Sequence, residues 1–326
     1  MPADLDVAVL AGGVGAARFL RGLTMVVPPE GVAAIVNTGD DTELHGLAIS
    51  PDLDTITYTL AGAIDPDRGW GLAGETWNAM EALARFALVK PAASAAGSTW
   101  FNLGDRDLAT HLYRTARLAE GASLTEVTAE ITGAWGIDCA LLPMTDDRFR
   151  TMLTLAENGD VVPFQEYFVR LRHGVAISDV SFDSRFGGRR SELAQQPREA
   201  LESAATIVIA PSNPLVSIGP IRALDGVDDL LVRRRDRVIA ISPIVGGAAL
   251  KGPADRMLVE LGFEASVTGV AQIYAEVASV LVIDTVDAHL APAVEALGMR
   301  CVVTPTVMST PELSRSLAVT CLATIG

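Results

Sequence analysis

The chain has 326 residues, of which 49% are hydrophobic, and a formal net charge of −15. This composition supports a large buried core and excludes wholesale disorder, while the acidic excess argues against a nucleic-acid partner. No apolar run approaches the roughly 18 residues of a membrane-spanning helix, and the first residues lack the basic and apolar segments of a signal peptide. The three cysteines are far apart. These features predict a cytoplasmic protein that does not associate with membranes.

The first predicted elements are a strand, a glycine-rich loop and a helix. Leu5–Ala11 is rich in Val and Leu and predicts a buried strand, and the helix runs to about Met25. Gly12, Gly13 and Gly15 lie between them. A glycine loop that opens a helix presents backbone N–H groups to phosphate, although the same spacing also occurs in simple tight turns. The pattern indicates a nucleotide phosphate site, with the tight turn as the alternative.

A second apolar run ends abruptly in polar and acidic residues. Asn37 is followed by Asp40 and Asp41, and Asp52 and Asp54 come about a dozen residues later. Open α/β sheets build their sites at the carboxyl ends of strands, and carboxylates this close repel unless protons, hydrogen bonds or a cation intervene. Because Mg²⁺ typically uses one or two carboxylates, we expect some of the four to hold the metal and the others to bind hydroxyl groups or order the loop.

Helical periodicity covers residues 53–64 and 76–86. The loop between them carries Arg68 and Trp70, the latter between two glycines. An exposed indole in a polar loop suits the stacking of a flat ring.

A charged cluster then precedes a helix that is predicted to run to about residue 118. It contains Asp105, Arg106 and Asp107, with His111 one turn later. The aspartates could be simple helix N-caps, but caps require neither the arginine between them nor the histidine. We therefore expect a functional role for this cluster.

The following residues, 111–175, predict a mainly helical excursion. Ser123 and Glu126 have the spacing of a capping box and are read as structural. Arg170 and Arg172 are expected on one face of an extended segment, which suits either a phosphate or carboxylate grip or a solvated strand edge.

An alternation of strands and helices resumes at residue 204 and continues to a last helix near 311–323. A strand at 206–210 is followed by Ser212 and Asn213, and a strand at 238–242 leads into a loop whose only lysine is Lys251. Polar loops thus follow several predicted strands. A glycine loop, clustered aspartates and nearby arginines are the set of groups that phosphoryl or nucleotidyl transfer with Mg²⁺ requires.

These motifs resemble, in the same order and over almost the whole chain, those of the 2-phospho-L-lactate transferase family of coenzyme F-420 biosynthesis, which includes actinobacterial phosphoenolpyruvate transferases. The resemblance rests on Ala11–Arg18, Asn37–Asp41, Ser50–Thr55, Arg68–Gly71, Leu103–His111, Ala210–Pro214 and Ser242–Gly247.

The resemblance implies a Rossmann-like α/β fold with a mostly parallel sheet, helices on both faces and an inserted, mainly helical subdomain. Residues 1–110 and 204–326 would form the core that binds the guanylyl diphosphate donor, and residues 111–203 the insert that covers the deazaflavin acceptor. The ribityl hydroxyl of 7,8-didemethyl-8-hydroxy-5-deazariboflavin would attack the phosphorus that bears lactate or enolpyruvate, and GMP would leave. A homodimer is expected from the family.

The resemblance also suggests a role for each motif. Asp41 is the first choice for Mg²⁺, and Asp40 and Asp54 support the metal or orient the attacking hydroxyl. The remaining predicted ligand-binding residues are Gly12, Gly13, Gly15 and Asn37 for the donor phosphates and the loop beside them, Ser212 and Asn213 for guanosine, and Arg68, Trp70, Asp105, Arg106 and His111 for the acceptor or the donor phosphates.

Two other classes of protein fit parts of the sequence. A non-catalytic regulator on a similar fold that binds UDP-sugars would need the nucleotide cradle but not the motifs around Trp70 and Asp105. An NAD-dependent oxidoreductase would need an acidic ribose reader at the end of the second strand, where Asn37 stands instead. Both alternatives are therefore less favoured than the transferase.

Overall fold

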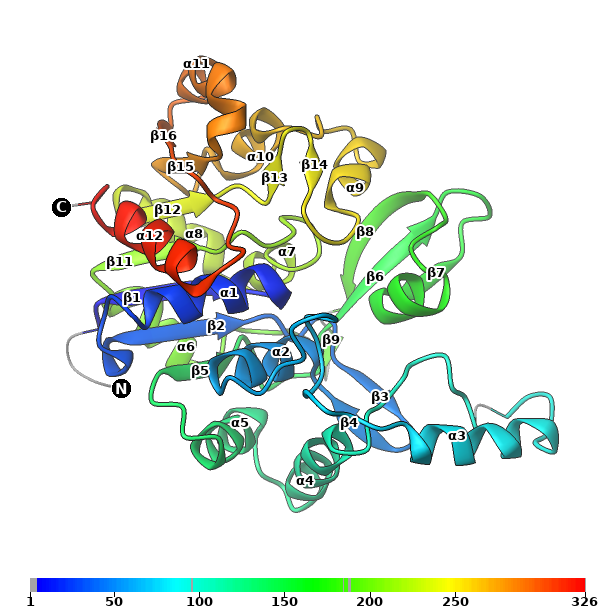
Figure 1. Ribbon diagram of the computed structural model, residues 1–326. Coiled ribbons are helices and arrows are strands. Elements are labelled where there is room, and N and C mark those ends of the chain that lie inside the picture. Colours follow the sequence, from blue (N-terminus) through cyan, green and yellow to red (C-terminus); the bar gives the residue numbers. More distant parts are fainter. Residues whose placement is uncertain (1–4, 95, 184, 187–188, 326) are drawn as a thin grey trace.

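A seven-stranded, all-parallel sheet forms the centre of the computed structural model, which describes residues 5–94, 96–183, 185–186 and 189–325 (Figure 1). The strand order is β16-β15-β12-β11-β1-β2-β5. The strands are β1 (Val7–Ala11), β2 (Val32–Val36), β5 (Ala140–Pro143), β11 (Thr206–Ile209), β12 (Val238–Ile241), β15 (Val280–Ile283) and β16 (Arg300–Val303).

Helices cover both faces of this sheet, as the sequence predicted. Successive side chains of β1 enter opposite hydrophobic cores: Val9 packs in the core with α1, α2 and α12, and Leu10 in the core with α6, α8 and α10. A strand buried on both faces reads as a continuous apolar run because neither set of side chains meets water. The helices named here are α1 (Gly13–Leu23), α2 (Pro51–Leu60), α6 (Gln195–Ser203), α8 (Val227–Arg233), α10 (Val267–Tyr274) and α12 (Pro311–Leu322).

The chain reverses its direction of travel through the sheet between β1 and β11. From β1 it moves outward through β2 to β5, and from β11 it moves outward on the other side through β12, β15 and β16. The loops after β1 and β11 therefore diverge at the carboxyl edge of the sheet. In open α/β sheets this switch point forms the crevice in which ligands bind.

Residues 111–203 contain more strand than a mainly helical insert would. After α4 (Asp107–Ala119) and α5 (Leu124–Ala134), which begins with the predicted Ser123–Glu126 capping box, β5 joins the main sheet beside β2. A separate antiparallel sheet follows, in which β6 alternates buried and half-buried residues. It comprises β6 (Arg150–Leu155), β7 (Val161–Pro163) and β8 (Ile177–Asp183), with a π-helical turn η3 (Glu166–Arg170) between β7 and β8. The division into 1–110 with 204–326 and 111–203 remains a prediction.

The remaining elements are short and connect these layers. Helix α3, with η2, projects from the body of the molecule (Figure 1). These short connecting elements are η1 (Pro29–Gly31), β3 (Thr42–Leu44), β4 (Leu47–Ile49), α3 (Asn78–Ala84), η2 (Arg85–Leu88), β9 (Arg185–Phe186), β10 (Arg189–Arg190), α7 (Gly219–Arg222), η4 (Arg235–Arg237), β13 (Ile244–Val245), β14 (Ala248–Ala249), α9 (Ala254–Glu260), η5 (Thr285–Leu290) and α11 (Ala291–Ala296).

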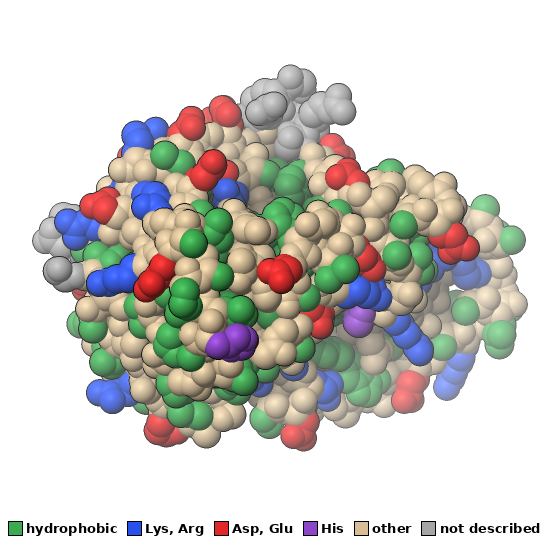
Figure 2. Space-filling model, turned by 90° about the horizontal axis from the view of Figure 1, so that it is seen from above, with side chains coloured by type: hydrophobic (Ala, Val, Ile, Leu, Met, Phe, Trp, Pro, Cys, Tyr) green, Lys and Arg blue, Asp and Glu red, His purple; other side chains and the backbone are tan. Residues whose placement is uncertain are grey.

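Charged side chains of both signs lie on the surface (Figure 2). Figure 2 shows acidic and basic side chains interspersed over one face of the molecule. Within the described ranges, no helix has the length and hydrophobicity needed to cross a membrane.

Candidate active site

A cavity of about 760 Å³ lies at the switch point, lined by the loops that follow β1, β2, β11 and β12. It brings together ten of the predicted site residues from segments far apart in the sequence. These are Gly12, Gly13, Gly15, Asp40, Asp54, Arg68, Trp70, His111, Ser212 and Asn213.

The glycine loop is packed directly against the loop after β11. A Cβ atom on Gly15 would lie 2.2 Å from the carbonyl oxygen of Pro211, and one on Gly12 would lie 2.7 Å from Cβ of Ser217. The Ser212 hydroxyl donates to the carbonyl oxygen of Gly12 over 2.7 Å. No side chain caps the start of α1, and its first turn carries no acidic residue. The helix N-terminus at the switch point is therefore suited to an anion.

Four predicted residues do not line the cavity: Asn37, Asp41, Asp105 and Arg106. The Asn37 side chain orders the loop around the carboxylates, since its Nδ2 donates to Asp52 over 3.0 Å and its Oδ1 accepts from the backbone N–H of Gly39 over 2.8 Å.

Asp105 binds the N-terminal end of the projecting helix α3. Its carboxylate accepts hydrogen bonds from the Thr76 hydroxyl and from the backbone N–H groups of Asn78 and Ala79. These donors lower the pKa of Asp105 to about 2. Arg106 is exposed and donates to the carbonyl oxygen of Ala73. Asp105 therefore does not cap α4, as the N-cap alternative had it, but binds the first backbone N–H groups of α3.

The carboxylates after β2 are buried and incompletely paired. Asp40 Oδ1 and Asp41 Oδ1 have no hydrogen-bond partner among the described residues, while Asp41 Oδ2 accepts from the Ser50 hydroxyl over 2.6 Å. Burial raises the pKa of Asp40 and of Asp41 well above the ordinary value, and repulsion from Asp52 adds to both shifts. Burial also raises the pKa of Asp52 to about 6. A cation at these oxygens would relieve all three shifts.

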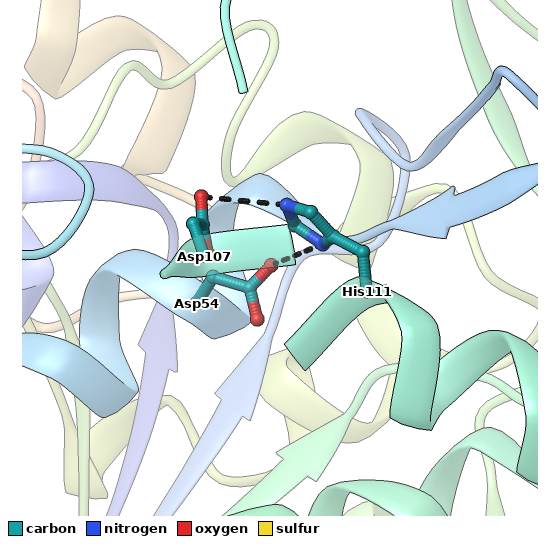
Figure 3. Close-up of side chains that lie close together, drawn as sticks. All are labelled: Asp54, Asp107 and His111. Carbon is teal, nitrogen blue, oxygen red and sulfur yellow. Dashed lines mark ion pairs between the residues drawn. The ribbon is translucent and has the colours of Figure 1, made fainter. Parts of the chain in front are cut away.

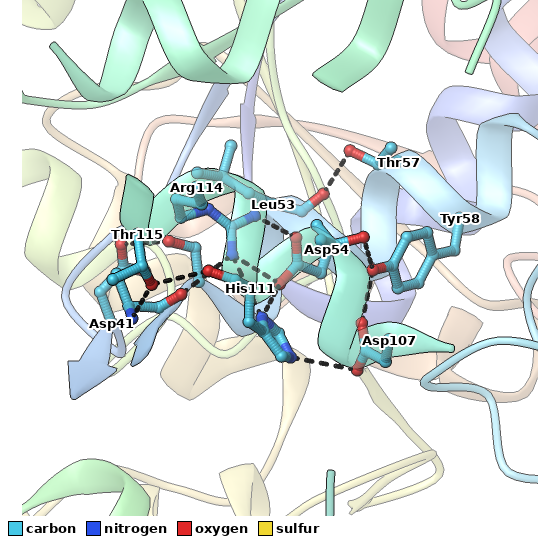
Figure 4. A network of polar contacts seen from close by, with 12 residues as sticks. Asp41, Leu53, Asp54, Thr57, Tyr58, Asp107, His111, Arg114 and Thr115 are labelled. Carbon is cyan, nitrogen blue, oxygen red and sulfur yellow. Dashed lines mark hydrogen bonds and ion pairs between the residues drawn. The ribbon is translucent and has the colours of Figure 1, made fainter. Parts of the chain in front are cut away.

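A second network joins α2 to α4 (Figures 3 and 4). Asp54 receives both terminal nitrogens of Arg114, with Nη1 at 3.2 Å from Oδ2. His111 lies between two carboxylates, with Nδ1 at 3.7 Å from Asp54 and Nε2 at 3.3 Å from Asp107. Tyr58 donates to Asp107 over 2.5 Å. Although burial opposes the shift, His111, Tyr58 and Arg114 hold the pKa of Asp107 below its ordinary value.

The prediction named His111 in this network but not Asp107, Arg114 or Tyr58 as site residues. Asp107, His111 and Arg114 are spaced i, i+4 and i+7 on α4, and Tyr58 follows Asp54 by four residues on α2. Residues at these spacings share one helix face. This spacing in the sequence could have identified Asp107, rather than Asp105, as the aspartate that lies on the same helix face as His111.

Aromatic side chains form another part of the cavity wall. The Arg68 guanidinium lies 5.4 Å from the ring centres of both Trp70 and Trp77, and Trp70 is 44% exposed. Phe164 and Phe168 stack on each other at 5.4 Å and also line the cavity. Such surfaces suit a flat aromatic ligand.

The expectation of an extended segment around Arg170 and Arg172 is wrong. Residues 166–170 form the π-helical turn η3, which places Phe168 and Val169 on the cavity wall. Arg170 instead pairs with Glu166 over 2.6 Å on the exposed side.

Two clusters of acidic residues in the site could hold a metal ion. Asp54, Asp107 and His111 bring one ligand atom each within 4.8 Å of one another, but Arg114 already pairs with Asp54 and Tyr58 with Asp107. Asp40 and Asp41 present unpaired oxygens, and oxygen is the ligand that Mg²⁺ prefers. The residues present therefore fit a divalent cation.

The parallel sheet, the glycine loop at its switch point and the carboxylate-lined cavity define an α/β nucleotide-binding protein with the groups needed for transfer chemistry. A model of the family described as 2-phospho-L-lactate transferase CofD matches residues 7–302. The chain is 40% identical over 317 residues to the phosphoenolpyruvate transferase of Streptomyces griseus, and 37% identical over 330 residues to that of Mycobacterium tuberculosis. Each match covers 96% of both proteins. The chain belongs to the 2-phospho-L-lactate transferase CofD family, which confirms the predicted transferase of coenzyme F-420 biosynthesis.

Solved structures support the fold. A protein of the UPF0052 family from Bacillus halodurans superposes with a TM-score of 0.63 at 14% identity, covering 98% of this chain and 99% of that one. A second structure of that protein gives a TM-score of 0.60 at 15% identity and covers 93% of each chain. At such low identity the likeness concerns the α/β fold, whose prediction it confirms.

Proposed function

We propose that the protein transfers an enolpyruvyl phosphate group from a guanylyl diphosphate donor to the ribityl hydroxyl of the deazaflavin acceptor, releasing GMP. The observation that carries this proposal is one cavity that combines the glycine loop, an unpaired carboxylate oxygen of Asp40 and an aromatic wall. The names of the relatives favour enolpyruvate over lactate as the transferred acid.

In this proposal the donor diphosphate lies against the glycine loop, and Ser212 and Asn213 face the guanosine half. The aromatic side chains, including Trp70, hold the deazaflavin ring, and Phe164 and Phe168 from residues 111–203 cover it. The acceptor oxygen forms a bond to the phosphorus that bears the acid while the bond from that phosphorus to the GMP oxygen breaks.

Mg²⁺, when bound, would neutralise charge that develops on the phosphate oxygens. Asp40 and Asp41 would hold it. Asp40 is favoured as the direct ligand because it lines the cavity, whereas Asp41 is bonded to Ser50 behind the wall. Asp54, held by Arg114, and Asp107, held by Tyr58 and His111, are fixed acceptors that can orient the attacking hydroxyl and receive its proton.

Ligand binding tests the class of function. Deazaflavin and GDP should each raise the melting temperature, because each binds only the folded state. Stabilisation by a UDP-sugar or NAD alone would favour one of the competing classes. The transferred acid is tested by incubating enzyme, deazaflavin and both donors and weighing the product. A product carrying lactate only would contradict the enolpyruvyl assignment.

The pH dependence of stability tests the metal site. Without Mg²⁺, the free energy of unfolding should fall as the pH rises from about 4 through 6 and above. At these three carboxylates the folded state binds more protons than the unfolded state in that window, since the pKa of Asp52 is raised to about 6 and those of Asp40 and Asp41 are also raised. Asp52 by itself would contribute about 2 kcal/mol to this loss.

Mg²⁺ should flatten this decline, because the cation replaces the protons that the carboxylates lose. Urea unfolding between pH 4.5 and 8, with EDTA or with MgCl₂, measures both effects. Stability that rises with pH in EDTA, or that ignores Mg²⁺, would contradict the site.

We also propose a cytoplasmic homodimer. The free cysteines Cys139, Cys301 and Cys321 fit a reducing compartment. Sedimentation at several protein concentrations tests the oligomeric state, and a monomer at micromolar concentration would contradict the dimer.

A further inference from the structure

Two cationic side chains on the cavity wall have no role in the scheme above. Arg18 lies on α1, one turn beyond the glycine loop, and lines the cavity. It is half-buried and forms no hydrogen bond or ion pair with any described residue. An arginine that points its five donors at no protein partner is available to an anionic ligand.

Lys251 reaches the same cavity from the loop after β14. Its Nζ donates to the carbonyl oxygen of Arg68 over 3.0 Å, which uses one of its three donors. A Cβ atom on Gly69 would lie 2.4 Å from this Nζ, so the glycine leaves room for the ammonium group. Burial and then the positive charge of Arg18 lower the pKa of Lys251. The two cations are therefore near enough to repel each other, and an anion between them would relieve that repulsion.

The position of the pair selects the kind of anion. Arg18 follows the loop assigned to the donor diphosphate, and Lys251 is anchored to the loop of Arg68 and Trp70, assigned to the acceptor. The pair thus lies where the donor and acceptor loops meet, which is where the transferred group must be. The diphosphate already has the glycine loop and the proposed metal, whereas the carboxylate of the transferred acid has no partner.

We propose that Arg18 and Lys251 form the subsite that binds the carboxylate of the transferred acid. This inference rests on the proposed function and extends it to substrate selection. A guanidinium fork matches a carboxylate in two parallel hydrogen bonds, and the ammonium group adds a point charge. The subsite recognises the feature that lactate and enolpyruvate share, so it rejects donors without a carboxylate and leaves the choice between those two acids to other contacts.

Steady-state kinetics and GDP binding test this assignment together. Arg18→Gln should raise KM for the donor about 10- to 100-fold, the range for a lost charge-assisted hydrogen bond, with kcat changed less than about threefold. Lys251→Gln should act in the same direction. The dissociation constant for GDP, which lacks the acid, should be unchanged in both variants. Arg21→Gln is the matched control, because Arg21 lies on the same helix outside the cavity lining.

A donor whose carboxylate is a methyl ester completes a double-mutant cycle. Wild-type enzyme should use the ester as poorly as Arg18→Gln uses the acid, and the variant should not distinguish the two donors. Equal loss of GDP affinity would show that the pair binds the diphosphate instead and would overturn the inference, as would an unchanged KM. Failure of GDP and deazaflavin to bind wild-type protein would reject the proposed function itself, which separates the two failures.

Discussion

Asp40→Asn is expected to lower kcat about 100- to 1,000-fold, the usual cost of one preorganised electrostatic contact at the reacting group. In the absence of Mg²⁺, the free energy of unfolding of the variant should be at least as high as that of the wild-type protein. Asp40 lines the cavity with an unpaired oxygen, and burial and its neighbour Asp52 raise its pKa. An amide of the same shape removes a buried charge from a crowded cluster, so repulsion falls as catalysis is lost.

Single-turnover rates and urea unfolding, each with and without Mg²⁺, measure these two effects. Asp41→Asn is the informative comparison, because Asp41 was the first choice from sequence but lies behind the cavity wall. A larger loss in Asp41→Asn than in Asp40→Asn would restore Asp41 as the direct ligand. If both variants keep activity within about tenfold, roughly 1.4 kcal/mol of barrier, neither residue holds a catalytic metal.

Arg114→Met should destabilise the fold by about 3–5 kcal/mol, the usual cost of removing one partner of a buried ion pair. The Arg114 side chain is 2% exposed, and both of its terminal nitrogens bind Asp54. Its charge also offsets part of the rise that burial causes in the pKa of Asp41. Without Arg114, no buried arginine among the described residues would balance the negative charge of Asp54 and the carboxylates near it.

Urea unfolding at neutral pH measures this loss. The matched control is Arg117→Met on the same helix, whose more exposed pairs with Glu120 and Glu130 predict a much smaller loss. The double variant Asp54→Asn/Arg114→Met should recover most of the stability but remain inactive. A loss below about 1 kcal/mol in the single variant would show that water or a cation replaces Arg114.

The parallel α/β fold, the strand ends that carry the site and the family could all be inferred from the order of residues in the chain. Strands buried on both faces are continuous apolar runs, so their ends were visible where Asn37 and Ser212 begin polar segments. The glycine loop could also be predicted from the sequence. In the structure, Gly12 and Gly15 let this loop pack so closely against the loop after β11 that a side chain at either position would clash.

Which polar residue of each motif faces the cavity could not be inferred in this way, because it depends on how the elements pack. Asp105 and Asp107 are two residues apart, yet one binds the start of α3 and the other meets Tyr58 and His111, because Asp105 lies in the turn before α4 and Asp107 is the first residue of that helix. Asp40 and Asp41 are adjacent in the sequence, yet Asp40 lines the cavity and Asp41 accepts a hydrogen bond from Ser50.

Contacts between distant segments were equally invisible in the sequence. Arg114 pairs with Asp54, Phe168 reaches the cavity on a π-helical turn, and Lys251 is held by the carbonyl oxygen of Arg68. Residue type and local spacing report which groups a chain has available. Their partners depend on helix rotation and on the burial that desolvates a charge, and these are properties of the packed fold.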